Sequence, residues 1–253
     1  MYSLRNLCAS YGKKLILRNI SVDVPPGLVS LIGPNGSGKS TLLRVLAGLM
    51  AYSGNVILHG REVMRFSRRE FARYVAFVMS SNNFRPSYPF SVREIIEMGR
   101  LPHRGIFTRL TRSDNDAVNQ SAKILGISHL LSRDIMTLSD GERQLVFIAC
   151  SLAQKTGIIL LDEPTSALDP DKSAKVFALL RTLADNGRSI ITAVHDINLS
   201  LSYSDYYIAL KGGELISHGQ EISAEVLHDL YCTKFIPYHN DERNDSMWRA
   251  LPQ

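Results

Sequence analysis

The stretch of sequence that decides the fold is the run Gly33-Pro34-Asn35-Gly36-Ser37-Gly38-Lys39-Ser40. Its pattern, G-x-x-x-x-G-K-S, is typical of a loop that holds nucleotide phosphates. Glycine tolerates positive φ and lets the backbone approach phosphate oxygens, while successive N–H groups form an anion site at a helix N-terminus. We therefore predict that these residues and Thr41 bind nucleotide, with Lys39 reaching the β- and γ-phosphates and the Ser40 hydroxyl ligating Mg²⁺.

The flanks of this loop support a phosphate site over a plain glycine-rich turn. LVSLIG, residues 28–33, is a short apolar run that indicates a buried strand. KSTLLRVLAGLM, residues 39–50, carries apolar residues at helical spacing. The local order is therefore strand, glycine-rich loop, helix, and the expected ligand is a nucleotide with Mg²⁺ as cofactor.

A second strand ends in two carboxylates. GIILLDEP, residues 157–164, is an apolar run that closes on Asp162 and Glu163. Ligands of open α/β sheets bind beyond the carboxyl ends of the strands, so Asp162 is expected to face the phosphate loop and hold Mg²⁺, directly or through water. Glu163 is expected to polarise the attacking water as a general base. The alternative, that two acids merely end a strand, is disfavoured by the phosphate loop.

Element patterns outline the rest of the chain. Residues 1–32 hold short extended segments, and residues 54–66 resemble a hairpin. Residues 67–155 are mainly helical in pattern, with few strand-like runs. Residues 157–196 alternate strand, helix and strand, which predicts a parallel sheet with a crossover helix. The polar end, residues 239–253, is expected to be loosely ordered.

Composition limits the class of protein. The chain has 253 residues, a net charge of +5 and three cysteines. The basic excess suits a nucleotide, an anionic membrane face or nucleic acid, but the arginines are dispersed, so nucleic acid is not an expected partner. An odd cysteine count without motif spacing argues against a disulfide framework or a zinc site and favours a reducing compartment. No run approaches the roughly 18–20 apolar residues of a membrane span, so membrane attachment would need another subunit.

Further motifs carry a resemblance to a known family. Between the two nucleotide motifs stands Leu138-Ser139-Asp140-Gly141-Glu142-Arg143-Gln144, which resembles the signature sequence of the ABC ATPases. Ser166-Ala167-Leu168-Asp169 looks like the D-loop of that family. His195 is similar to its switch histidine, and Tyr11 to the aromatic residue that stacks on adenine. The resemblance covers about residues 2–235.

The resemblance implies a fold and a division of the chain. The expected fold class is α/β: a P-loop NTPase core with a mostly parallel sheet, an N-terminal antiparallel β subdomain and an inserted α-helical subdomain. Residues 1–253 would form a single ABC ATPase domain. Within it we expect the core at about residues 1–66 and 156–235, the helical subdomain with the signature at 67–155, and a C-terminal tail at 236–253.

The resemblance also implies a mechanism shared between two subunits of a homodimer. ATP at one phosphate loop is completed by Ser139 and Gly141 of the other subunit, His195 contacts the γ-phosphate, and Asp169 couples the two sites. The residues agree with this picture locally, because Ser139 and Glu142 have the spacing of a capping box that starts a helix. The N-terminus of such a helix favours negative charge, and a purely structural cap is compatible with the same pattern.

Two positions depart from the family pattern. Ser80 occupies the position where the family carries a glutamine that reaches the metal, and serine is too short to replace it. We therefore expect slower hydrolysis or altered coupling, unless Asn82 or Asn83 substitutes. Asp140 stands at a position where the family commonly has glycine. Its carboxylate either interacts favourably with the helix dipole or places negative charge near the phosphate.

Two segments resemble importers of iron–siderophore complexes, haem and cobalamin, namely residues 91–103 and 195–200. This implies integral membrane permease subunits as partners, with a coupling helix docked around residues 80–105, and a substrate-binding protein as an indirect partner. The chain would lie in the cytoplasm, peripheral to the inner face of the membrane. The alternatives are an ABC transporter for another substrate, or a slow-hydrolysing regulatory or soluble ABC ATPase. Repair ATPases separate the two motifs by long coiled coils, whereas here about a hundred residues without sustained heptads intervene.

Overall fold

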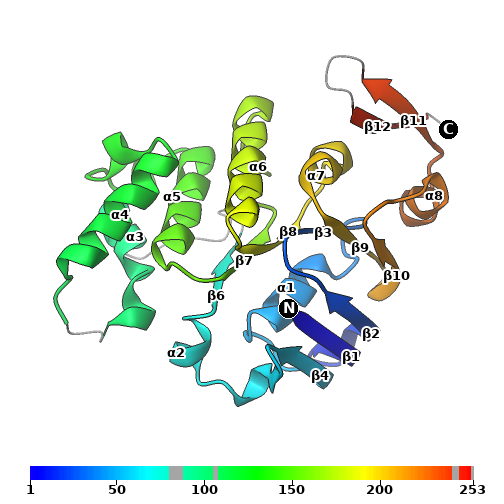
Figure 1. Ribbon diagram of the computed structural model, residues 1–253, viewed down its shortest axis with the longest axis horizontal. Coiled ribbons are helices and arrows are strands. Elements are labelled where there is room, and N and C mark those ends of the chain that lie inside the picture. Colours follow the sequence, from blue (N-terminus) through cyan, green and yellow to red (C-terminus); the bar gives the residue numbers. More distant parts are fainter. Residues whose placement is uncertain (80–87, 105–107, 241–244, 252–253) are drawn as a thin grey trace.

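The computed structural model describes residues 1–79, 88–104, 108–240 and 245–251. Its centre is a sheet of strand order β10-β9-β3-β8-β7-β6 (Figure 1). The five strands from β9 to β6 are parallel neighbours, and β10 is antiparallel to β9. The bounds are β3 Leu28–Ile32, β6 Val75–Val78, β7 Ile158–Asp162, β8 Ser189–Ala193, β9 Tyr206–Lys211 and β10 Glu214–Gly219.

Every residue of β3, β7 and β8 is buried. Strands covered on both faces are continuous apolar runs rather than alternating ones, which explains LVSLI and IILLD in the sequence. β7 and β8 are adjacent and parallel, and α6 (Pro170–Asp185) connects them, so the predicted β-α-β unit is confirmed. The carboxyl ends of β3, β7 and β8 therefore meet at one edge of the sheet.

A second, antiparallel sheet packs beside α1 (Lys39–Leu46) at the N-terminal side of the molecule (Figure 1). Its strand order is β2-β1-β4-β5. The Tyr2 hydroxyl donates a buried 2.8 Å hydrogen bond to the Leu46 carbonyl, which ties this sheet to the helix after the phosphate loop. The bounds are β1 Tyr2–Tyr11, β2 Lys14–Val24, β4 Ser53–Leu58 and β5 Arg61–Glu62, and the last two form the predicted hairpin.

The middle of the chain is a helical region with its own apolar cluster, which includes Val92, Ile96, Val118 and Val146. Its helices are α3 Val92–Met98, α4 Arg112–Ile124 and α5 Asp140–Ala153, with the short turns η3 Leu101–His103, η4 Ser128–Leu130 and η5 Ile135–Thr137. The chain enters it through η1 Val63–Arg65, α2 Arg68–Phe71 and the edge strand β6.

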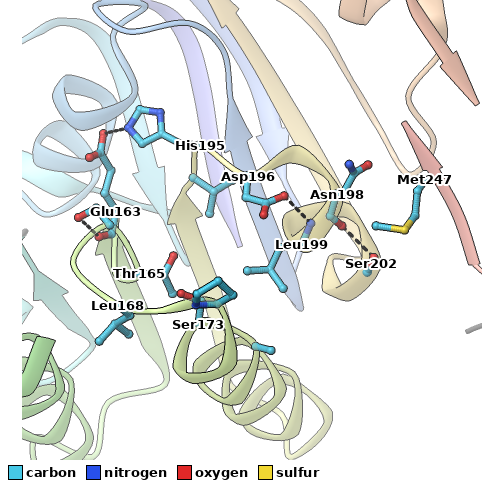
Figure 2. A pocket seen from close by; sticks show the side chains of 14 residues that line it. Glu163, Thr165, Leu168, Ser173, His195, Asp196, Asn198, Leu199, Ser202 and Met247 are labelled. Atoms are coloured by element: carbon cyan, nitrogen blue, oxygen red, sulfur yellow. Dashed lines mark hydrogen bonds and ion pairs between the residues drawn. The ribbon is translucent and has the colours of Figure 1, made fainter. Parts of the chain in front are cut away.

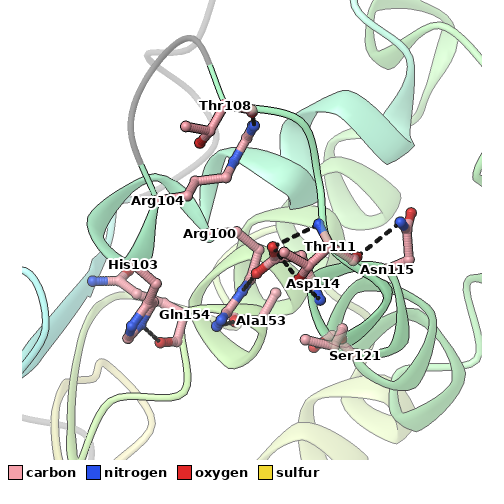
Figure 3. A network of polar contacts seen from close by, with 11 residues as sticks. Arg100, His103, Arg104, Thr108, Thr111, Asp114, Asn115, Ser121, Ala153 and Gln154 are labelled. Carbon is pink, nitrogen blue, oxygen red and sulfur yellow. Dashed lines mark hydrogen bonds and ion pairs between the residues drawn. The ribbon is translucent and has the colours of Figure 1, made fainter.

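A buried ion pair joins the helices of this region (Figure 3). Arg100 Nε lies 2.8 Å from Asp114 Oδ1, and both side chains are less than a tenth exposed. Arg100 Nη1 also donates to the Ala153 carbonyl at the end of α5. Asp114 accepts the Thr111 hydroxyl at the start of α4, and the hydrogen bonds from Thr111 and Arg100 lower the pKa of Asp114 to about 2. The Arg100 side chain, which lies just after α3, thus connects the end of that helix to the start of α4 and the end of α5.

We expect Asp114→Asn to destabilise the protein by about 3–5 kcal/mol, because it leaves the Arg100 guanidinium buried without a counter-charge. Since the folded-state pKa is depressed, the carboxylate stabilises the fold above about pH 4 and loses that effect as the pH falls toward 2. Urea unfolding at both ends of this range measures the difference. Asp116→Asn, at an exposed position on the same helix, is the control. An equal effect of both variants at pH 7 would contradict the prediction.

The C-terminal segment corrects an expectation. Residues 239–253 were expected to be loosely ordered, but β11 (Phe235–Asn240) and β12 (Asp245–Ala250) form an antiparallel hairpin beside α7 (Ile197–Tyr203) and α8 (Ala224–Tyr231) (Figure 1). Trp248 packs with Ile197 and Phe235 against a buried cluster that contains Leu227. Apolar contacts with residues distant in the sequence therefore order this segment, although its composition is polar. Within the described residues, no helix combines the length and the apolar character that crossing a bilayer requires.

Candidate nucleotide site

The phosphate loop joins β3 to α1, as predicted, and Lys39 is the first residue of the helix. Lys39 Nζ donates to the carbonyls of Gly33 at 2.6 Å and Pro34 at 3.1 Å, so the ammonium is folded back across the loop. Burial lowers the pKa of Lys39, and the nearby Glu163 and Asp162 carboxylates oppose that shift. The loop lines a cavity of about 250 Å³, together with Lys14, Ile16 and Glu163.

The close packing of the loop explains its first glycine. Gly33 has φ +145°, and a Cβ atom there would lie 2.0 Å from the Leu210 carbonyl oxygen. No side chain fits in that space, and the backbone angle is one that L-residues rarely adopt. The Gly33 amide finds its partner outside the loop, because it donates a hydrogen bond to the Tyr231 hydroxyl at 3.1 Å. The loop thus packs closely against β9 and is hydrogen-bonded to α8.

Ser40 and Asp162 face each other across the carboxyl edge of the sheet. The Ser40 hydroxyl donates to Asp162 Oδ1 at 2.8 Å. Burial raises the pKa of Asp162, while the hydrogen bond from Ser40 lowers it. A hydroxyl and a carboxylate oxygen in contact at a phosphate loop are the hard oxygen ligands that Mg²⁺ prefers. The residues present therefore fit the predicted metal.

Glu163 and His195 form a second pair at the same edge (Figure 2). His195 Nε2 lies 2.6 Å from Glu163 Oε1. Glu163 follows β7 directly and has φ +51°, an uncommon backbone conformation that clusters at functional sites. His195 follows β8 closely, so the adjacency of β7 and β8 brings the two side chains together. The carboxylate also lines the cavity of the phosphate loop.

The predicted signature begins α5 with a full capping box. The Ser139 amide and hydroxyl both donate to Glu142 Oε2, at 2.9 and 2.8 Å, and the Glu142 amide donates back to Ser139 Oγ. The hydrogen bonds from Ser139 lower the pKa of Glu142. The Asp140 carboxylate pairs with Arg143 at 3.0 Å and is largely exposed. The signature therefore starts a helix, as the spacing predicted.

The signature packs against the D-loop of its own chain. A Cβ atom on Gly141 would lie 3.0 Å from the Ala167 carbonyl oxygen and 3.1 Å from Leu168 Cδ2. Asp169 then caps α6, with its Oδ1 accepting the Lys172 amide at 2.8 Å. Among the described residues that line the phosphate-loop cavity, neither Ser139 nor Gly141 is present.

Tyr11 ends β1 and is about half exposed, with its hydroxyl accepting a 2.7 Å hydrogen bond from Arg44 Nη1 on α1. Ser80, Asn82 and Asn83 lie outside the described residues. Sequence reasoning missed Lys14, Ile16 and Arg44. Lys14 and Ile16 follow Tyr11 across a tight turn, and Arg44 lies one helical turn after Ser40. Their closeness in sequence to these predicted site residues is the signal that could have identified them.

The fold and this site define a P-loop nucleoside-triphosphate-binding protein, with phosphate loop, carboxylate pair and histidine at one sheet edge. The model of the ABC transporter family matches residues 17–166. The chain belongs to this family, and its fold is that of the ABC ATPases, with the predicted antiparallel sheet and helical region. It is an ATPase of this class.

Relatives and solved structures agree on the family. The chain is 37% identical to the ferric enterobactin transport ATP-binding protein FepC of Escherichia coli (strain K12), covering 89% of this chain and 84% of that protein. It is 36% identical to the iron(3+)-hydroxamate import ATP-binding protein FhuC of Bacillus subtilis (strain 168), covering 86% and 81%. It is similar to an inward-facing structure of a metal-chelate type ABC transporter, with a TM-score of 0.85, 26% identity and coverage of 100% and 98%.

Proposed function

We propose that this chain is the ATP-hydrolysing subunit of an importer for an iron chelate, a ferric siderophore in the first instance. The observation that carries the ATPase role is the Glu163–His195 pair beside the phosphate loop. The importer role is supported by FepC, FhuC and the metal-chelate type transporter, whose names state chelate transport. Haem or cobalamin would be alternative cargo of the same chemical kind.

The phosphate loop binds the triphosphate. The residues that carry it are Gly33, Pro34, Asn35, Gly36, Ser37, Gly38, Lys39, Ser40 and Thr41. Lys39 exchanges its present carbonyl partners for β- and γ-phosphate oxygens, which satisfy an ammonium better than neutral carbonyls do. Ser40 and Asp162 hold Mg²⁺, which when bound neutralises phosphate charge. Tyr11 offers an exposed ring on which adenine stacks.

Glu163 accepts the proton of the attacking water, and His195 contacts the γ-phosphate. The 2.6 Å distance between His195 Nε2 and Glu163 Oε1 supports both roles. The contact fixes the orientation of both side chains before the nucleotide binds. Positioning and charge stabilisation supply most of the catalysis in phosphoryl transfer, so this preorganisation is the main contribution of the pair.

The active unit is a homodimer in which each copy lends Ser139 and Gly141 to the other's triphosphate. Support comes from the phosphate-loop cavity, whose described lining is without these residues, and from the capped helix start that can receive an anion. Asp169 is the last residue of the D-loop, which packs on Gly141, and so couples the two sites. Residues 1–66 with 156–235 act as the ATP-binding core, 67–155 as the helical subdomain and 236–253 as a tail.

The helical subdomain receives a segment of the permease around residues 80–105. In the described part of this stretch Tyr88, Met98 and Leu101 are exposed at 74%, 40% and 36%. Exposed apolar side chains within one short stretch of the chain support a protein partner there. The chain would then lie at the cytoplasmic face of the membrane, with a substrate-binding protein acting on the far side.

Reconstitution tests this function. We expect the chain, co-purified with its partner permease and placed in liposomes, to drive ATP-dependent uptake of a radiolabelled ferric siderophore. The control is the same complex with Lys39→Ala, which lacks the phosphate-binding ammonium. Haem and cobalamin uptake in parallel identify the cargo. ATP hydrolysis by the complex without uptake of any of the three would contradict the importer role.

A further inference from the structure

The C-terminal hairpin is fastened to α7 by the side chain of Asn198. Asn198 Nδ2 donates to the Trp248 carbonyl at 2.9 Å, and the Trp248 amide donates to Asn198 Oδ1 at 2.7 Å. One carboxamide thus pairs with both backbone groups of one residue, 50 positions away in sequence. This arrangement reproduces the pairing that a neighbouring strand would offer.

The register of the hairpin explains why Trp248 presents these groups. Trp248 lies opposite Pro237, which has no N–H to donate. In an antiparallel pair, residues at such a position direct their N–H and C=O away from the partner strand. The outer edge of β12 therefore carries an unpaired donor and acceptor, and Asn198 satisfies both.

Asn198 lies in the first turn of the helix that follows His195. Asp196 caps α7 by accepting the Leu199 amide at 2.9 Å, so His195 is joined directly to the capped helix start. Glu163, His195, Asn198 and Met247 line one cavity of about 480 Å³ (Figure 2). The hairpin is thus a wall of the space beside the Glu163–His195 pair.

From this geometry we propose that Asn198 is a positioning residue for ATP hydrolysis. By clamping the first turn of α7 to the hairpin, it fixes the helix start and keeps His195 within reach of Glu163. The residue touches neither nucleotide nor the reacting atoms and acts through the backbone from 195 to 198. The inference rests on the proposed roles of Glu163 and His195.

The test uses the full chain in its complex with the permease. Because a misplaced catalytic group reduces turnover steeply, we expect Asn198→Ala to lower kcat about tenfold, while KM for ATP changes less than about twofold. The fluorescence measurement uses the full chain without the permease, in which Trp248 is the single tryptophan, so its emission reports the clamp directly. In Asn198→Ala its emission shifts to the red and acrylamide quenches it more strongly.

Two further variants separate clamping from helix stability. Asn198→Asp keeps an acceptor and adds a favourable negative charge to the first helical turn, but it cannot donate to the Trp248 carbonyl. We expect an intermediate loss of kcat. Ser202→Ala removes a hydroxyl that donates to the Asn198 carbonyl on the same cavity wall, and it should leave kcat and Trp248 emission unchanged.

Three results would overturn the proposal: unchanged Trp248 emission in Asn198→Ala, a shifted emission with wild-type kcat, or equal losses in Asn198→Ala and Ser202→Ala. Absence of ATPase activity in the wild-type complex would instead overturn the proposed function. The two failures are distinguishable, because the Trp248 emission of the variants is measured without any turnover.

Discussion

Replacing Glu163 with glutamine is expected to lower ATP hydrolysis by about two to four orders of magnitude while ATP still binds. Glutamine has the shape of glutamate and can stay beside His195, but its amide cannot accept a proton from water. Lys39, Ser40 and Asp162 are untouched, so the triphosphate keeps its contacts. Single-turnover hydrolysis and binding of radiolabelled ATP measure the two effects separately.

Thr165→Ala is a matched control for Glu163→Gln, because Thr165 lines the same cavity and lies two residues further along the chain. Its hydrolysis rate should remain close to that of the wild type. A Glu163→Gln protein that hydrolyses ATP at a near wild-type rate would remove Glu163 from its proposed role and leave the base unidentified.

Mixing two inactive variants should restore activity that neither has alone. Lys39→Ala disables the phosphate loop but retains the signature, and Ser139→Arg blocks the signature but retains the phosphate loop. In a mixed dimer, the loop of one copy meets the signature of the other, so one site of the two is intact. Random pairing makes half of the dimers mixed, which restores about a quarter of the wild-type sites.

The ATPase rate of the mixture, compared with each variant alone at the same total concentration, is the measurement. Fused pairs with defined variants in each half provide the control. A pair with one change in each half keeps one intact composite site, whereas a pair that carries both changes in one half keeps none. A mixture as inactive as its components would contradict a site shared between copies and would place Ser139 in a purely structural cap.

Local sequence was sufficient to predict the phosphate loop, the acidic strand end and the capped signature helix. Each is a contiguous pattern whose chemistry lies within a few residues: GPNGSGKS, IILLDE and Ser139 with Glu142. The parallel sheet was also predictable, because alternating strands and helices have few allowed connections. These predictions needed no knowledge of distant contacts.

The helical region was predicted in outline, but the contacts that hold its helices together were not. The Arg100–Asp114 pair spans 14 positions and is buried only because α3, α4 and α5 pack together. Strand β6 was missed within a segment that is mainly helical in pattern, because VAFV is too short to be told from part of a helix and is a strand through its pairing with β7.

By itself, the sequence determined that this chain has a phosphate loop, and it predicted which residues meet the phosphates, because the pattern for this chemistry lies in contiguous residues. Only the tertiary structure decided that Glu163 lies 2.6 Å from His195, that Gly141 packs on the D-loop, and that a polar C-terminus becomes a hairpin held by Asn198. The physical reason is that these contacts join segments far apart in the chain. The free energy that stabilises these contacts comes from burial and pairing between separate elements, and a local sequence pattern does not predict it.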